Sequence, residues 1–137
     1  MKILLTLLLL FSLTSIHSVK AQDRFRRDYK HVVVDIDGQP DKSGEYNGHN
    51  IFIFNYNENA DVMHITSDRN KILYVRTSPI EEDQHENGVG YSFFKAINEN
   101  GDPVLIKIFH KEKYGVQLFT NLSDDEPDAV FHFLNLE

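Results

Sequence analysis

The sequence is an acidic chain of 137 residues with 14 Lys and Arg against 21 Asp and Glu, a net charge of −7, and no cysteine. The excess of acidic residues argues against nucleic acid or an anionic membrane surface as a partner, because both would be repelled. Without cysteine the chain can hold no disulfide and no cysteine-linked lipid, so its stability must come from a hydrophobic core.

Residues 1–21 have the pattern of a cleavable signal peptide. A positive start at Lys2 precedes an apolar run over residues 3–13, and the segment ends with the small residue Ala21. An uncleaved anchor is the alternative, but the run is too short to span a bilayer comfortably. Cleavage would leave 116 residues with 12 basic and 21 acidic side chains, hence a charge of −9. We expect a secreted or periplasmic protein with no transmembrane span after signal cleavage.

Two further segments follow the leader in the predicted organisation. Residues 22–30 are charged and irregular, which predicts a flexible N-terminal arm. Residues 31–137 form a single β domain, and their length suits one domain.

The β signal extends over the whole of this domain. Runs of β-branched and aromatic residues alternate with clusters of Asn, Asp, Gly and Pro, while no window of ten residues has a helical period. Eight strands are predicted, over residues 31–37, 46–56, 61–66, 71–77, 90–98, 103–110, 115–121 and 129–135.

Short turns connect many of these strands. Residues 57–61 (Asn-Glu-Asn-Ala-Asp) and 98–102 (Asn-Glu-Asn-Gly-Asp) are near copies that suit hairpins. Residues 67–70 and 113–115 are further tight turns. Consecutive hairpins make neighbouring strands antiparallel, which predicts a meander. The longer connections, residues 38–45, 78–89 and 122–128, are predicted to be loops.

Two strands are apolar on both faces, which indicates closure of the sheet. Residues 51–54 and 104–109 have no clean polar side, and burial on both faces without helices requires a barrel or two packed sheets. We predict an all-β fold in which about eight antiparallel strands form an up-and-down barrel; a β-sandwich is the alternative.

The chain resembles the calycins, the superfamily of lipocalin-like and streptavidin-like barrels. The export signal, the strand count, the hairpins and the sequence Gly44-Glu45-Tyr46 at a strand start carry the resemblance. Lipocalins have Gly-x-Trp at the first barrel strand; Tyr46 replaces the Trp here, and the predicted strand over 31–37 precedes the motif. The resemblance implies a barrel, which in this superfamily can hold a small apolar ligand.

The sequence gives little support for catalysis. It has no Cys nucleophile and no Gly-x-Ser-x-Gly motif, and its serines fall mostly in predicted turns without an adjacent base. The carboxylate pairs Asp35/Asp37 and Glu81/Glu82 are interpreted as solvated charges. We therefore assign no catalytic residue and expect no cofactor.

Metal binding has only weak candidates. His64, His110 and His132 fall in predicted strands and could converge as zinc ligands. Isolated strand or core histidines are the preferred interpretation. Loops rich in Asp and Asn lack the glutamate and the flanking helices of an EF-hand calcium site, so no metal is predicted.

Aromatic residues on strands are the remaining functional signal. They either fill a solid core, which is slightly favoured, or line an apolar ligand cavity. The lining candidates are Phe52, Phe54, Tyr56, Tyr74, Tyr91, Phe93, Phe109, Phe119, Phe131 and Phe133.

Three function classes follow from these observations. The first is a non-catalytic exported barrel that binds a small apolar ligand in an internal cavity, with its mouth near residues 78–89 or 38–45. The second is an envelope or secreted interaction or structural protein, with another envelope or extracellular protein as partner and an exposed apolar patch or an unpaired strand edge. The third is a small enzyme.

Overall fold

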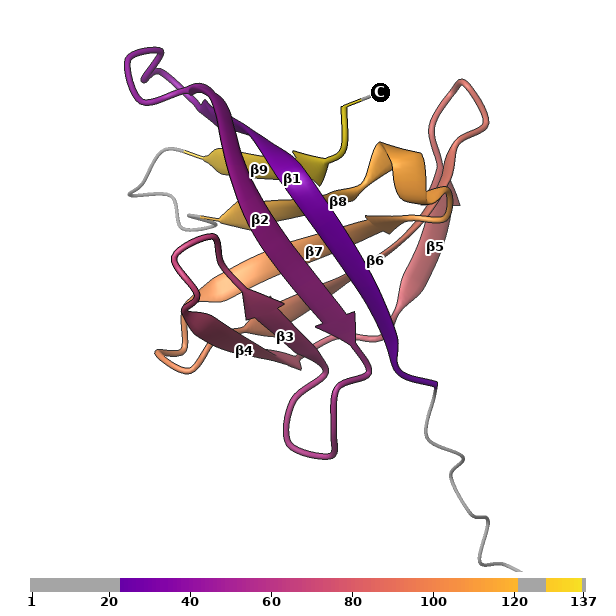
Figure 1. Ribbon diagram of the computed structural model, residues 1–137. Coiled ribbons are helices and arrows are strands. Elements are labelled where there is room, and N and C mark those ends of the chain that lie inside the picture. Colours follow the sequence, from indigo (N-terminus) through magenta and orange to yellow (C-terminus); the bar gives the residue numbers. More distant parts are fainter. Residues whose placement is uncertain (1–22, 121–127, 137) are drawn as a thin grey trace, which may run out of the picture.

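The computed structural model describes residues 23–120 and 128–136 and is built almost entirely of strands (Figure 1). A single turn of 3₁₀ helix, η1 (Glu112–Tyr114), interrupts the described strands. No helix among these residues has the length and apolar character needed to cross a membrane. The strands are β1 (Phe25–Ile36), β2 (Gly44–Phe54), β3 (Val62–Ile65), β4 (Lys71–Arg76), β5 (Glu81–Gln84), β6 (Gly90–Ile97), β7 (Pro103–Phe109), β8 (Val116–Thr120) and β9 (Ala129–Leu134).

Eight of these strands close into an antiparallel barrel. Apart from β4 and β5, neighbours in the chain are neighbours in the sheet, and pairing of β1 with β9 joins the two ends of the meander. The remaining gap closes where Val75 and Arg76 of β4 pair with Ile97 and Ala96 of β6. The prediction of an all-β meander barrel is confirmed, and the architecture is compatible with a lipocalin-like barrel. Gly44, however, opens β2 and not the first strand.

The two near-copy turns perform the same local task. In the β2–β3 turn the Asn57 side-chain oxygen accepts hydrogen bonds from the backbone N–H groups of Asn59 and Ala60. In the β6–β7 turn the Asn98 oxygen accepts from Asn100 and Asp102. Each asparagine thus satisfies two backbone donors that the hairpin leaves unpaired, which explains why the sequence uses the same turn twice.

The first strand starts earlier than the sequence predicts. Residues 25–30, which we expected to belong to a flexible arm, pair with β2 from Phe25 opposite Phe54 onward. Phe25 and Tyr29 face the barrel interior with their partners, while Arg26 and Asp28 face outward. The charged outer face hides this alternation, so that the segment has the composition of an arm and the structure of a strand.

A second difference is a strand within the predicted 78–89 loop. Glu81–Gln84 form β5, which pairs with Gly90–Phe93 of β6 and continues the line of β4 along the same edge. All four residues of β5 are exposed, and three are acidic. They carry no apolar signal, and the pairing with β6 is what makes them a strand. Residues 122–127 of the third predicted loop, residue 121 at the end of the preceding predicted strand, and the leader lie outside the described residues.

The core occupies the barrel interior. Along β2 the side chains of Phe52 and Phe54 point inward and are almost fully buried, whereas Ile51 and Ile53 face outward and are half-buried. Residues 51–54 are therefore apolar on both faces because the inner face is in the core and the outer face is half-buried. The interior cluster comprises Tyr29, Phe52, Phe54, Val62, Tyr74, Phe94, Ala96, Val104, Ile106, Val116, Leu118 and Phe133.

Gly115 is required where β8 follows η1. Its φ of +79° is unfavourable for a side chain, and a Cβ there would lie 1.8 Å from the Phe133 carbonyl oxygen. The backbone at Gly115 therefore approaches β9 more closely than a residue with a Cβ would permit. The Gly115 carbonyl also accepts the hydrogen bond of the Phe109 N–H, which ties the end of β7 to this turn.

Candidate functional site

The ten aromatic ligand-lining candidates separate into two groups. Phe52, Phe54, Tyr74 and Phe133 belong to the buried interior cluster, and the half-buried Phe131 packs against it. Four candidates lie on the outer face of the sheet, because each is next along its strand to a residue whose side chain faces the core. They are Tyr91, Phe93, Phe109 and Phe119. Tyr56 follows β2, with the Arg24 guanidinium 5.2 Å from its ring centre. Most of the interior group fills the middle of the barrel.

One end of the barrel is not filled. A cavity of about 190 Å³ opens where β1 begins, β2 and β4 end, and the segment after β4 passes across. It is lined by the side chains of Phe25, Phe54, Val62, Ile80, Phe94 and Ile108, together with Asn55, Asp61, Arg76, Glu82 and Ser92. Of the ten candidates only Phe54 is in this lining. Ile80 and Glu82 come from the predicted 78–89 segment, near which the sequence placed the mouth of a cavity.

Charged groups line the cavity as well. The Asp61 carboxylate accepts a hydrogen bond of 2.6 Å from the Arg76 backbone N–H and so fixes the end of β4. The Arg76 and Glu82 side chains form no salt bridge within the part of the chain that the structure describes. The cavity therefore combines an apolar lining with one positive and two negative side chains, the pattern of a site that holds an apolar molecule and orients it.

A serine–histidine pair borders the cavity. Ser92, in β6, lines it, and the Ser92 Oγ lies 3.1 Å from His110 Nε2 just beyond β7. His110 fits because residue 90 is glycine: a Cβ at Gly90 would lie 2.7 Å from the ring Nδ1. Glu82 of β5 is the cross-strand neighbour of Ser92, and β5 pairs with the edge of β6 opposite to β7. Ser92 and His110 are thus in contact at the end of the barrel, and Glu82 is next to Ser92 on the adjacent strand.

Sequence reasoning missed this pair, although the β6–β7 turn contains the signal. Pairing Asn98 with Asp102 across the predicted turn sets the register and places Gly90 opposite His110. Gly90 is two residues before Ser92, so Ser92 and His110 are diagonal neighbours on one face of the sheet. The observed bond from the His110 N–H to the Gly90 carbonyl has this register. The pair is not apparent from local sequence, because Ser92 and His110 are 18 residues apart and meet only through the pairing of β6 with β7.

The three candidate metal histidines have three different environments. His64 is in the core, His110 beside Ser92, and His132 on the outer face, where its Nε2 donates to the Tyr114 carbonyl at 2.7 Å. The described residues contain no group of three or more His, Asp or Glu side chains arranged to hold a metal ion.

His64 is a buried neutral histidine. Its Nε2 is 2.9 Å from the Asn50 side-chain oxygen, and its ring stacks on Phe52 with centroids 4.2 Å apart. Burial lowers the pKa of His64 to about 4, because the charged form would lose its hydration. The neutral ring therefore donates from Nε2, and its Nδ1 has no partner among the described residues.

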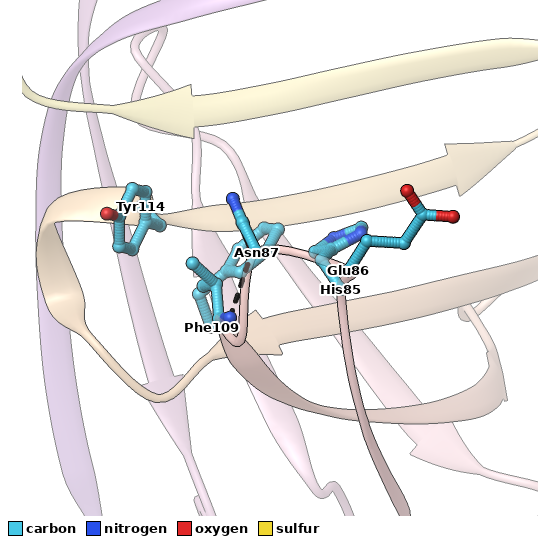
Figure 2. A pocket seen from close by; sticks show the side chains of 6 residues that line it. His85, Glu86, Asn87, Phe109 and Tyr114 are labelled. Atoms are coloured by element: carbon cyan, nitrogen blue, oxygen red, sulfur yellow. Dashed lines mark hydrogen bonds between the residues drawn. The ribbon is translucent and has the colours of Figure 1, made fainter.

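A second hollow lies on the outer face, beneath the β5–β6 loop. Figure 2 shows this open groove, which is lined by His85, Glu86 and Asn87 of the loop, together with Val89, Phe109 and Tyr114. The loop covers Phe109, whose side chain is only 6% exposed although it points away from the barrel interior. This explains why β7 is apolar on both faces at its end.

Lys107 connects the aromatic rings of this outer cluster. Its Nζ is 3.8 Å from the ring centre of Tyr91, 5.2 Å from that of Phe109, and 2.9 Å from His85 Nε2. Burial lowers the pKa of Lys107, and the nearby Asp83 opposes this effect. A charged lysine can donate to a neutral His85 in this geometry, so the contact holds the loop against the sheet.

Comparison with protein-family models, with curated proteins and with solved structures found no match.

Proposed function

We propose that this protein is a small exported barrel that binds a small apolar molecule in the cavity at the end of its barrel. The observation that carries the proposal is the cavity of about 190 Å³ with six apolar side chains in its lining. The interior beyond it is packed with Tyr29, Phe52 and Ile106, which are fully buried. A ligand would therefore enter only the end of the barrel.

The cavity volume limits the size of the ligand. An engineered apolar cavity of about 150 Å³ accommodates benzene, whereas drug-sized ligands need about 300 Å³ or more. We therefore propose a ligand no larger than one aromatic ring or a short alkyl chain, with a polar group that reaches the Arg76, Glu82 and Ser92 side chains. Larger lipids and steroids would not fit without moving core side chains.

Filling the cavity from its mouth tests this function. Ile80 is 37% exposed at the rim, so Ile80→Trp should place the larger ring in the cavity without rebuilding the core. Ile97 is 36% exposed and is absent from the cavity lining, so Ile97→Trp is a matched control. Titration with benzene, phenol and hexanol, followed by ¹H–¹³C NMR of the cavity methyl groups, should show saturable shifts in the wild type and the control.

The outcomes of this titration are distinct. Ile80→Trp should abolish the shifts or weaken affinity at least tenfold. Absence of saturable shifts with all three probes, or equal binding by both tryptophan variants, would contradict the proposed ligand site.

The proposal includes export from the cytoplasm. It rests on the leader, in which a positive residue precedes an apolar run and a small residue at position 21. Intact mass measurement of the protein from its own host should give a 116-residue chain beginning at Gln22. A full-length chain in the cytoplasmic fraction would contradict it.

A further inference from the structure

We infer that Ser92 and His110 form a nucleophile–base pair that cleaves small acyl esters held in the barrel-end cavity. The inference rests on the proposed function, because it places the acyl group in the proposed ligand site. Its geometric basis is the distance of 3.1 Å between Ser92 Oγ and His110 Nε2, within the range over which a histidine activates a serine. Ser92, the residue that would react, also lines the apolar cavity.

The environment of His110 favours a role as base. Its ring occupies the space left by the missing side chain of Gly90, which fixes the ring against β6 with Nε2 toward Ser92. His110 also borders a shallow surface depression shared with Glu82 and Lys111. Solvent water can therefore reach the imidazole from outside, while the acyl group would approach Ser92 from the cavity.

The charged lining of the cavity suits the charges that develop during acyl transfer. Arg76 carries the positive charge among the lining residues, and a cation there stabilises an acyl oxyanion. Glu82, the cross-strand partner of Ser92, borders the same surface depression as His110, so its negative charge would favour the protonated imidazole. Both residues act here through their electric field across the cavity.

The proposed reaction is a two-step ester hydrolysis. Ser92 Oγ bonds to the acyl carbon and its proton moves to His110 Nε2; the bond from the acyl carbon to the alcohol oxygen then breaks, and Nε2 returns the proton to that oxygen. In the second step a water oxygen bonds to the acyl carbon while its proton moves to Nε2. The bond to Ser92 Oγ breaks, and Oγ takes the proton back. Ester and water give carboxylic acid and alcohol.

The cavity also defines the substrate class. A volume of about 190 Å³ accepts an acyl group of one ring or a few carbons, so butyryl and benzoyl esters are suitable, and long-chain acyl esters are not. The alcohol would remain outside, where the rim is polar.

Labelling with a small fluorophosphonate, read by intact mass and peptide mapping, tests the pair directly on the mature protein. We expect one adduct on Ser92, none in Ser92→Ala, and a labelling rate in His110→Gln about a hundredfold lower, since a general base contributes about that much. Ser67→Ala should be labelled as the wild type is, because Ser67 is exposed in the β3–β4 turn. Hydrolysis of 4-nitrophenyl butyrate should follow the same order.

A cysteine variant keeps the test decisive if Ser92→Ala does not fold. Because the chain has no cysteine, Ser92→Cys and Ser67→Cys each carry a single thiol. Iodoacetamide should alkylate the former at least tenfold faster near neutral pH, and adding His110→Gln should remove the difference.

Failure of this inference can be separated from failure of the binding function. Benzene binding without Ser92 labelling would overturn the esterase and leave the ligand site intact. Labelling of Ser92 without benzene binding would support the pair and contradict the ligand site. Wild-type labelling rates in His110→Gln, or equal alkylation of both cysteines, would overturn the pair.

Discussion

The middle of the barrel and its cavity end are made from the same strands but are packed differently. In the middle, Phe52, Tyr29 and Ile106 leave no room for solvent, and the polar groups His64 and Asn50 bond to one another. At the cavity end, side chains of similar type surround about 190 Å³ of space, and charged residues join the lining.

This difference shows how one sheet can support both stability and a site. Side chains in the middle contribute by excluding water, so their removal creates a void in a rigid surrounding. At the end, part of the surface already contacts solvent, so substitutions cost less folding energy and change the site. Four predictions test this distinction.

The largest effect is expected from truncating a ring in the middle. Phe52→Ala should lower the free energy of unfolding by about 3–5 kcal/mol, because it removes a fully buried ring that packs on Phe54, His64 and Phe133. Ile80→Ala, at the cavity rim, should cost less than about 1 kcal/mol. Urea unfolding monitored by circular dichroism measures both. Equal losses would show that the two regions do not differ in packing.

The second prediction concerns the loss of stability at low pH. The pKa of His64 is about 4 in the folded protein and about 6.5 when exposed. Between these values the unfolded chain binds the proton and the folded chain does not, so stability falls as the pH falls from about 6.5 to about 4. The total loss is about 3 kcal/mol.

His64→Gln provides the control for this pH effect. A glutamine can donate to Asn50 but does not titrate, so the free energy of unfolding of His64→Gln should depend less on pH over that window. Superimposable pH profiles of the two proteins, each normalised to its value at pH 7, would show that His64 does not titrate as a buried group.

The fold was largely predictable because its signals are local. Alternation along each strand and the asparagine turns at residues 57–61 and 98–102 set strand order and direction. The start of β1 was missed because Arg26 and Asp28 are outward charges on a strand that buries Tyr29, while Phe25 at its start is still 41% exposed. β5 was missed because its four exposed residues show no alternation of apolar and polar side chains. They form a strand because they pair with β6.

The site was less predictable because it depends on distances between strands. Which aromatics face inward follows from register, and a one-residue shift reverses it. Phe109 shows a further limit: it faces outward and is buried because the loop with His85, together with Tyr114 and His132, covers it. The size of the cavity depends on how side chains of several strands pack together, which no single strand encodes.

The third prediction concerns Arg27, the charged residue that faces the interior from β1. Its guanidinium Nη1 donates to the Phe109 carbonyl at 2.7 Å and so connects β1 with the end of β7. Arg27→Met keeps the apolar stem and removes this bond, which should cost about 1.5 kcal/mol. Arg24→Met removes an exposed bond to the Tyr56 carbonyl and should cost less than half as much. Urea midpoints that rank the two variants in the opposite order would contradict the bridging role.

The smallest effect is expected on the outer wall. Arg26 Nε lies 2.6 Å from Asp28 Oδ1, and His49 Nε2 lies 3.0 Å from Asp28 Oδ2. Bonding to Arg26 lowers the pKa of Asp28 to about 2, so its contribution is present above about pH 4 and is lost as the pH falls toward 2. The Asp28 side chain is 39% exposed, and solvent screening limits that contribution to less than about 1 kcal/mol. Asp28→Asn should therefore change stability slightly at pH 7, less still in 1 M salt, and progressively less as the pH falls toward 2. A loss comparable to that of Phe52→Ala would mean that the outer charges, and not the filled interior, hold β1 in the barrel.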